Sequence, residues 1–119
     1  MLGKVLVFGA RGMVGSAMVR QLKSHASEVI PVTRDLCDLS NESRVGEILK
    51  IYKPDWIILA AAKVGGIIAN RDQPQQFLSE NLRIQLNVID EAHKQDINQL
   101  IFLGSSCIYP KHSVQPIEE

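Results

Sequence analysis

Short apolar runs alternate along the chain with longer segments in which apolar residues recur every three or four positions. Four of the runs lack the polar alternation of a half-exposed strand, so they predict strands that are buried on both faces of a sheet. These runs are residues 4–8, 28–33, 55–60 and 99–104. Because Pro31 has no N–H to donate, the second run is expected to be exposed along one hydrogen-bonding edge.

The longer segments predict three helices, over residues 13–22, 42–52 and 74–95. Asn41 is the expected N-cap of the second helix, and Pro74 opens the third. Each helix carries apolar residues at the spacing of one helix face. They are Val14, Ala17, Met18 and Leu22, then Val45, Ile48 and Leu49, then Leu78, Leu82, Leu86, Ile89 and Ala92.

Strands and helices alternate from end to end, which predicts βαβ units, right-handed crossovers and a parallel sheet. The expected fold class is α/β, a Rossmann-like parallel sheet with alternating helices. A doubly wound dinucleotide-binding fold normally has six strands, whereas four are predicted here. We therefore expect residues 1–119 to be a single domain that forms the N-terminal portion of such a fold, with its fourth strand at an open edge and no substrate domain. Residues 61–70 are expected to form a loop, and residues 105–119 show no periodic element.

Composition narrows the possible classes of function. The chain has 119 residues, of which 45% are hydrophobic and 22% charged, as in an ordinary globular domain. Its 13 basic and 13 acidic residues give a formal net charge of zero, which argues against nucleic acid and membrane surfaces as partners. No apolar run approaches the ~20 residues of a membrane span, and the two cysteines do not make a disulfide framework. We expect a cytoplasmic protein.

A glycine-rich turn joins the first predicted strand to the first predicted helix. It consists of Gly9, Ala10, Arg11, Gly12, Met13, Val14 and Gly15. In such a turn the first glycine permits the tight bend, the second lets the backbone approach a pyrophosphate, and the third lets the helix pack closely on the sheet. Free N–H groups at the helix N-terminus then favour the anion. All seven residues are candidate contacts of a dinucleotide cofactor, with a purely structural turn as the alternative.

The residues after the second predicted strand bear on which dinucleotide is bound. An acidic residue there would hold the ribose 2′-OH of NAD, whereas an arginine would favour the 2′-phosphate of NADP. Arg34 and Asp35 stand side by side, and Arg11 could reach the same corner. Two guanidinium groups match a dianionic phosphate, so we expect NADP(H), the alternative being that both arginines are solvated and Asp35 holds the ribose. Asp38 and Leu39 suit a contact with the adenine edge, although Asp38 equally suits a polar loop or a helix cap.

Three motifs resemble a known family. They are residues 9–17 (GARGMVGSA), 60–67 (AAAKVGGI) and 103–110 (LGSSCIYP). Together and in this order they closely resemble the GDP-L-fucose synthase family of the extended short-chain dehydrogenase/reductases. The resemblance runs over the whole chain, and its second and third motifs are far more specific than the glycine turn.

The resemblance implies an NADPH-dependent enzyme that epimerises carbons 3 and 5 of GDP-4-keto-6-deoxy-mannose and then reduces the 4-keto group. It further implies a GDP-sugar substrate and a homodimer. Ser105 matches the family serine near the keto oxygen, and Cys107 matches the cysteine assigned to proton transfer, although an inert thiol is the alternative reading. The family's cofactor positions also include Ala61, Ala62, Leu103, Gly104, Ser105 and Ser106, and its positions near the sugar are Lys63, Val64, Gly65 and Gly66.

The chain departs from the family pattern at the proton donor for reduction. The family's Tyr-x-x-x-Lys pair is absent, because neither Tyr52 nor Tyr109 has a lysine four residues later. The family histidine and substrate region also come from later sequence, so the chain resembles the N-terminal part of the enzyme and is expected to be inactive alone. No cysteine–histidine spacing suggests a metal site. Two alternatives stay open: a stand-alone NADP-binding regulatory module, and a fragment of an NAD-dependent sugar-nucleotide epimerase or dehydratase.

Overall fold

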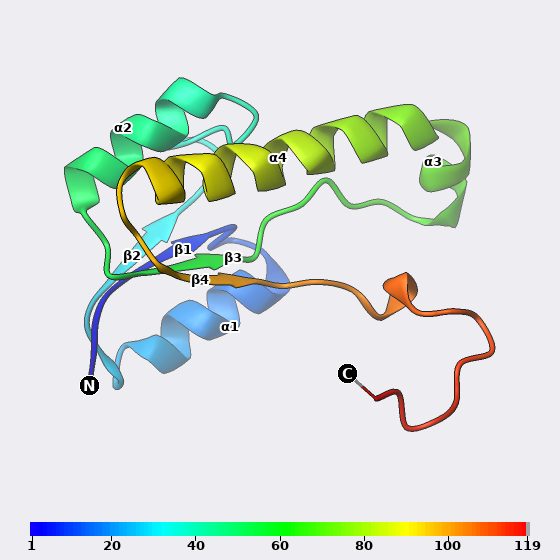
Figure 1. Cartoon of the computed structure of the whole chain (residues 1–119), viewed down its shortest axis with the longest axis horizontal. Coiled ribbons are helices and arrows are strands. Elements are labelled where there is room, and N and C mark those ends of the chain that lie inside the picture. The colour runs from blue at the N-terminus through cyan, green and yellow to red at the C-terminus, as the bar shows by residue number, and fades with distance from the viewer. Residues whose placement is uncertain (119) are drawn as a thin grey trace.

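Four parallel strands form one sheet in the computed structural model, which describes residues 1–118 (Figure 1). The strands are β1 (Leu2–Phe8), β2 (Ala26–Val32), β3 (Trp56–Leu59) and β4 (Gln99–Phe102). The helices are α1 (Met13–Leu22), α2 (Glu42–Tyr52), α3 (Ile67–Asp72) and α4 (Pro74–Lys94), and a 3-10 turn follows at Ser106–Ile108. The predicted Rossmann-like α/β fold with a parallel sheet and alternating helices is confirmed.

The strand order is β2-β1-β3-β4, and every neighbouring pair is parallel. β1 lies between β2 and β3, so that Val5 pairs with Val29 on one side and with Trp56 on the other. The chain therefore moves outward in one direction from β1 to β2, and in the opposite direction through β3 to β4. In doubly wound folds such a reversal opens a crevice at the carboxyl ends of the two strands, here β1 and β3, and ligands bind there.

The two outer strands have the edge character that the sequence predicted. β2 is an outer strand, and the side chain of Pro31 within it is exposed. At the other side β4 pairs with β3 alone within residues 1–118, so the expected open edge at the fourth strand is confirmed. Ile101 and Phe102 of β4 are both exposed there.

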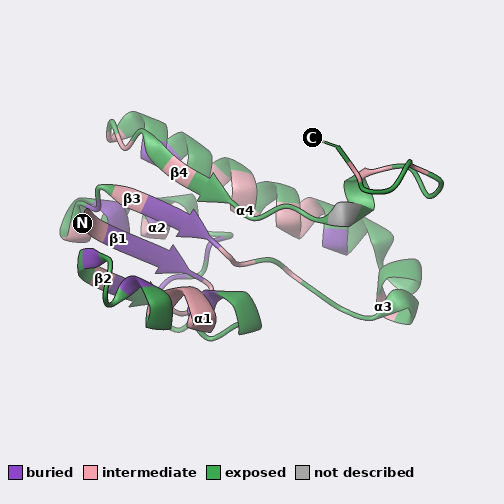
Figure 2. Cartoon of the chain, turned by 90° about the horizontal axis from the view of Figure 1, so that it is seen from below, coloured by how far each residue is buried: buried purple, intermediate pink, exposed green. Residues whose placement is uncertain are grey.

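Helices cover both faces of the sheet, with α1 on one face and α2 and α4 on the other (Figure 1). Alternate residues of β1 and β3 point into the two layers, and buried residues concentrate in these strands (Figure 2). The α1 layer contains Val5, Val7, Leu22 and Ile58, and the α2/α4 layer contains Leu6, Phe8, Val45, Ile48, Leu49, Ile57, Leu59 and Val88. Since burying one such side chain stabilises the fold by about 1.5–3 kcal/mol, both layers hold the central strands firmly.

The predicted helix ends are largely confirmed. The side chain of Asn41 accepts a hydrogen bond from the backbone N–H of Arg44 at 3.1 Å, which satisfies a free donor in the first turn of α2. α2 ends at Lys53, which adopts a left-handed conformation with φ of 45°. α4 begins at Pro74, where the missing N–H costs no intrahelical bond.

The prediction of a loop throughout residues 61–70 is wrong, because α3 begins at Ile67. The side-chain amide of Asn70 donates to the carbonyl oxygens of Gly65 and Gly66 at 3.0 and 3.1 Å. These two bonds tie the first turn of α3 to the glycines that precede it. A helix of six residues with none of them buried leaves no periodic apolar pattern in the sequence.

The apolar stripe predicted on α4 is not the face that meets the sheet. Of Leu78, Leu82, Leu86, Ile89 and Ala92, only Ala92 is buried. The helix packs inward through Phe77, Val88, Glu91 and Ala92, which form a second stripe beside the first. α4 has 21 residues, yet neither it nor any other helix within residues 1–118 is long and apolar enough to cross a membrane.

Candidate functional site

The parallel sheet brings four segments to one edge, each following the carboxyl end of a strand. They are residues 9–15 after β1, 33–39 after β2, 60–66 after β3 and 103–107 after β4. Every residue that the sequence nominated for a cofactor or substrate lies on one of these four segments. The carboxyl edge is also the side on which open α/β sheets bind ligands.

The glycine turn has the geometry expected for its first and third glycines. Gly9 has a φ of +80°, and a Cβ atom there would lie 2.5 Å from the carbonyl oxygen of Ala60. The backbone N–H of Gly12 donates to the carbonyl oxygen of Gly9 at 3.0 Å and closes the turn. Gly15 is buried, and its backbone packs directly on Gly9 with no room for a side chain. The tight bend and the close helix packing predicted from the sequence are thus confirmed.

The N-terminus of α1 is open toward the crevice. Gly12 is exposed, no side chain caps this helix end, and its first turn contains no acidic residue. Met13 and Val14 are also exposed. The first N–H groups of a helix have no intrahelical acceptor, and the helix dipole is positive at this end. The turn therefore forms a cradle of backbone donors that fits a pyrophosphate.

Of the three residues considered for the ribose end of the cofactor, Arg11 and Asp35 lie together. Nη1 of Arg11 lies 2.5 Å from Oδ2 of Asp35, and the two side chains are 75% and 68% exposed. An ion pair this exposed contributes little to stability, so a phosphate could take the place of Asp35. Arg34 is exposed beside them. The preference between NADP and NAD stays a prediction.

The carboxylate of Asp38 is engaged in hydrogen bonds within its own turn. Its Oδ1 accepts from the hydroxyl and from the backbone N–H of Ser40, at 2.7 and 3.0 Å. These bonds, the hydroxyl first, hold the pKa of Asp38 below its ordinary value. Leu39 is buried in the core, and its carbonyl oxygen accepts from Asn87 at 2.8 Å. The adenine contact at these two positions stays a prediction.

The segment after β3 is held by α4. The backbone N–H of Lys63 donates to Oδ1 of Asn81 at 2.7 Å, and the carbonyl oxygen of Lys63 accepts from Nδ2 of Asn81 at 3.0 Å. Nζ of Lys63 lies 3.1 Å from Oε1 of Glu80 and 5.4 Å from the centre of the Phe77 ring. The ammonium group nominated for the substrate is therefore engaged with α4.

The carboxyl of Glu80 is poised as an anion beside Lys63. Hydrogen bonds from Gln76 and then from Lys63 hold its pKa below the ordinary value. The sequence interpretation did not select Asn81 or Glu80 as site residues. Their contacts join positions 17 and 18 residues apart, which no local pattern reveals.

The segment after β4 places Ser105 and Cys107 at the same edge. The hydroxyl of Ser105 accepts from the backbone N–H of Cys107 at 3.1 Å, and both residues are exposed. Gly104 has nothing around the position where a side chain would begin. The other cysteine, Cys37, is buried, and burial raises the pKa of its thiol. Of the two cysteines, Cys107 is therefore the one that is exposed at the carboxyl edge, and its role in proton transfer stays a prediction.

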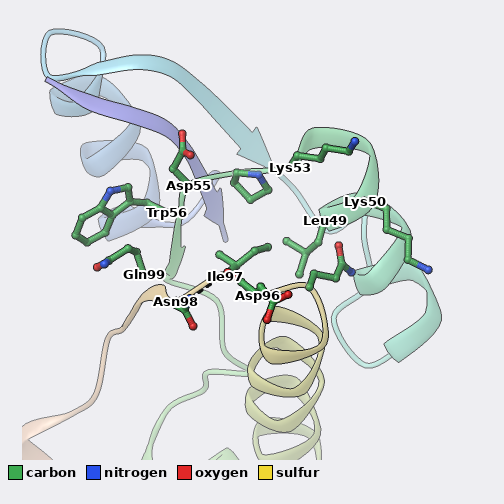
Figure 3. A pocket seen from close by; sticks show the side chains of 11 residues that line it. Leu49, Lys50, Lys53, Asp55, Trp56, Asp96, Ile97, Asn98 and Gln99 are labelled. Carbon is green, nitrogen blue, oxygen red and sulfur yellow. Dashed lines mark hydrogen bonds between the residues drawn. The ribbon is translucent and has the colours of Figure 1, made fainter.

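A hollow of about 600 Å³ lies at the opposite end of the sheet (Figure 3). Its walls come from the last turn of α2, from the loops that follow α2 and α4, and from the amino ends of β3 and β4, where Trp56 and Gln99 begin the strands. None of the four segments at the carboxyl edge contributes to it. The candidate site is therefore the carboxyl edge and not this hollow.

Comparisons with known proteins identify the family of the chain. The model of the NAD dependent epimerase/dehydratase family matches residues 5–119. A GDP-L-fucose synthase of Sinorhizobium fredii is 47% identical over 116 residues, which are 98% of this chain and 37% of that protein. A GDP-L-fucose synthase of Escherichia coli is 46% identical over 117 residues, which are 98% of this chain and 36% of that protein.

A solved structure is similar over nearly the whole chain. It is a GDP-mannoheptose C4 reductase from Campylobacter jejuni with NADP bound, at a TM-score of 0.88 and 32% identity. The similarity covers 98% of this chain and 37% of that one. The chain thus spans about a third of the length of the curated relatives it matches.

Proposed function

The chain belongs to the NAD dependent epimerase/dehydratase family, and we propose that it supplies the NADP(H)-binding part of an enzyme that makes GDP-L-fucose from GDP-4-keto-6-deoxy-mannose. The observation that carries this proposal is the identity of 46–47% to two GDP-L-fucose synthases over 98% of the chain. The sheet also brings the glycine turn and the two specific motifs to one edge.

The cofactor would lie across the carboxyl ends of β1 and β3. The open N-terminus of α1 would hold its pyrophosphate, and Arg11 and Arg34 would hold the 2′-phosphate. Ala61, Ala62, Leu103 and Gly104 would line the rest of the crevice. When bound, NADPH supplies the hydride that reduces the 4-keto group.

Ser105 and Cys107 would act on the sugar. Protons on the carbons beside a ketone become removable when a donor stabilises the oxyanion of the resulting enolate. The Ser105 hydroxyl would donate to that oxygen, and Cys107 would transfer a proton at carbon 3 or carbon 5 on its own face of the sugar ring. Epimerisation also needs an acid or base on the opposite face, which would come from the later sequence that carries the family histidine. A thiol is a much stronger acid than an alcohol, which makes cysteine a suitable residue type for proton transfer.

The partner that we propose is a second copy of the chain. Leu78, Leu82, Leu86 and Ile89 form an exposed apolar stripe along α4. An exposed apolar stripe of this length is typical of an interface. The outer face of α4 is therefore the surface through which a homodimer would form.

Two measurements test the proposed function. Titration of the chain with NADPH and with NADH, followed by nicotinamide fluorescence, should give the tighter binding for NADPH. The same affinity for both would favour the NAD-dependent alternative, with Asp35 on the ribose, and an absence of binding would contradict cofactor binding altogether.

Catalysis is tested in a chimera that joins these residues to the remaining two thirds of the Escherichia coli GDP-L-fucose synthase. With GDP-4-keto-6-deoxy-mannose in D₂O, the chimera should incorporate deuterium at carbons 3 and 5 and oxidise NADPH. Cys107→Ser should block deuterium incorporation while NADPH still binds, because a serine hydroxyl is too weak an acid to exchange the proton. Cys37→Ala is the matched control and should keep incorporation. Normal incorporation by Cys107→Ser would show that Cys107 is merely structural.

A further inference from the structure

The segment between β3 and α3 has no regular secondary structure over residues 60–66. Its beginning lies against the glycine turn, since a Cβ atom on Gly9 would be 2.5 Å from the carbonyl oxygen of Ala60 and 2.9 Å from the nitrogen of Ala61. This part of the segment is therefore a wall of the crevice at the ends of β1 and β3. Its shape decides how a cofactor can lie beside the turn.

The other end of this wall is fixed by one side chain. Both polar atoms of the Asn81 amide bind the main chain of Lys63, one as acceptor at 2.7 Å and the other as donor at 3.0 Å. Asn81 lies in the interior of α4, a helix of 21 residues that packs on the core through Val88 and Ala92. Helix α4 thus holds both the N–H and the carbonyl of Lys63, the residue that directly follows Ala62.

Two neighbouring side chains of α4, Glu80 and Phe77, also contact this segment. Glu80 pairs with the ammonium group of Lys63, and the Phe77 ring lies under it. A Cβ atom on Gly65 would lie 2.8 Å from Cζ of Phe77, so the segment runs closely over this ring. Lys63 is held through its main chain and through its side chain.

We propose that Asn81 is a positioning residue: its amide clamps the main chain of Lys63 so that Ala61 and Ala62 keep the conformation that receives the nicotinamide half of the cofactor. This inference rests on the proposed function. Asn81 contacts neither cofactor nor sugar, and it acts through the segment that does. Because only Ala61 and Ala62 lie between Ala60, which contacts Gly9, and the clamped Lys63, losing the clamp frees the wall at one end.

The experiment compares Asn81→Ala with Gln95→Ala in the whole chain. Gln95 is a matched control because its amide also donates to a backbone carbonyl of another element, that of Gly46 at 3.0 Å, but at the far end of α4. The rate of amide hydrogen exchange at the N–H of Lys63 measures whether the hydrogen bond to Asn81 is formed. An NADPH titration measures the affinity of the chain for the cofactor. Asn81→Ala should speed exchange at Lys63 by about tenfold and weaken NADPH binding by about tenfold, as the loss of roughly one net hydrogen bond implies. Gln95→Ala should change neither.

A second variant separates the clamp from a general loss of stability. Asn81→Asp keeps an acceptor for the N–H of Lys63 but cannot donate to its carbonyl, so both readouts should fall between those of the parent and of Asn81→Ala. Unchanged exchange and unchanged NADPH affinity in Asn81→Ala would overturn the inference and leave the proposed function standing. Equal losses in Gln95→Ala would also overturn it, since the effect would then be one of stability. If the parent chain does not bind NADPH, the proposed function fails and this positioning role fails with it, while the exchange rate still reports the clamp.

Discussion

Gly15 packs so closely on Gly9 that a Cβ atom on Gly15 would overlap the carbonyl oxygen of Gly9 and lie 2.7 Å from its carbonyl carbon. Both atoms belong to the backbone, so moving them aside would cost free energy of folding. The contact fixes how α1 leaves the turn, and with it the direction of the N–H groups that face the crevice.

Gly15→Ala should therefore destabilise the fold. Overpacking of this kind costs about 1–3 kcal/mol, which urea unfolding followed by circular dichroism would measure. Gly12→Ala is the comparison, because a Cβ atom there meets only the carbonyl oxygen of Gly9, at 3.3 Å. It should change the unfolding free energy by less than about 1 kcal/mol, yet weaken NADPH binding by blocking the approach of the pyrophosphate. Equal stability losses in both variants would contradict the separate roles of the two glycines.

Arg34→Ala should weaken NADPH binding by about 1.5–3 kcal/mol, the contribution of a charge-assisted hydrogen bond, and leave NADH binding nearly unchanged. Arg34 carries this prediction better than Arg11, whose removal would also break the pair with Asp35. Arg20→Ala, an exposed arginine in the last turn of α1, makes the same change in net charge and is the control. A calorimetric titration in which both cofactors lose affinity equally would rule out a 2′-phosphate contact at Arg34.

The acid stability of the chain should depend on the pair formed by Glu91 and Lys94. Glu91 is buried, and Lys94 bridges it to Glu42 of α2, at 2.7 and 2.6 Å. The hydrogen bond from Lys94 holds the pKa of Glu91 below its ordinary value, whereas both carboxylates raise the pKa of Lys94. A lowered carboxyl pKa stabilises the fold at pH values above the unfolded-state value of about 4.3, and this contribution is lost as the pH falls through the folded-state value.

Lys94→Met tests this expectation. It should lower the urea midpoint most at pH 7, and the difference from the parent should shrink as the solution is acidified through the pKa of Glu91. The raised pKa of Lys94 has the opposite effect on the pH dependence of stability. Its stabilising contribution persists from neutral pH up to the ordinary lysine value of about 10.4 and is lost only as the pH rises further. A difference between the two proteins that stays constant from neutral to acidic pH would show that the pair has no such role.

The elements that local pattern governs were predictable from the sequence. Strand β3 is an uninterrupted apolar run, and Asn41 marks the start of α2 by its own side-chain chemistry. The inward face of α4 was not predictable, because Leu82 and Val88 belong to two apolar stripes on one helix and only tertiary packing selects between them. The glycine turn could be identified from its spacing as a candidate cofactor-binding turn. The clamp of Asn81 on Lys63 could not, since it joins two elements through the fold alone.

The exposed stripe of α4 should make the chain self-associate. Leu82→Lys places a charge in the middle of the stripe. Because the side chain of Leu82 is 47% exposed, its replacement should remove little packing from the core. Sedimentation velocity should give a dimer for the parent and a monomer for this variant. Ile51→Lys is the control on the exposed side of α2 and should leave the association unchanged. Monomeric parent protein at micromolar concentration would contradict the proposed homodimer.

The 119 residues by themselves should show no measurable reduction of a GDP-keto sugar. Hydride transfer to a ketone leaves negative charge on its oxygen, and a positioned proton donor contributes about 10²–10⁴-fold to such a step. Tyr52 lies at the end of α2, remote from the carboxyl edge, and Tyr109 is followed by Pro110 and no lysine at the required spacing. Absorbance of the reduced nicotinamide at 340 nm, with purified chain, NADPH and GDP-4-keto-6-deoxy-mannose, measures the reaction. The chimera with the later part of the Escherichia coli relative is the positive control, and steady turnover by the chain alone, with host enzyme excluded, would mean that a group outside any Tyr-x-x-x-Lys pair delivers the proton.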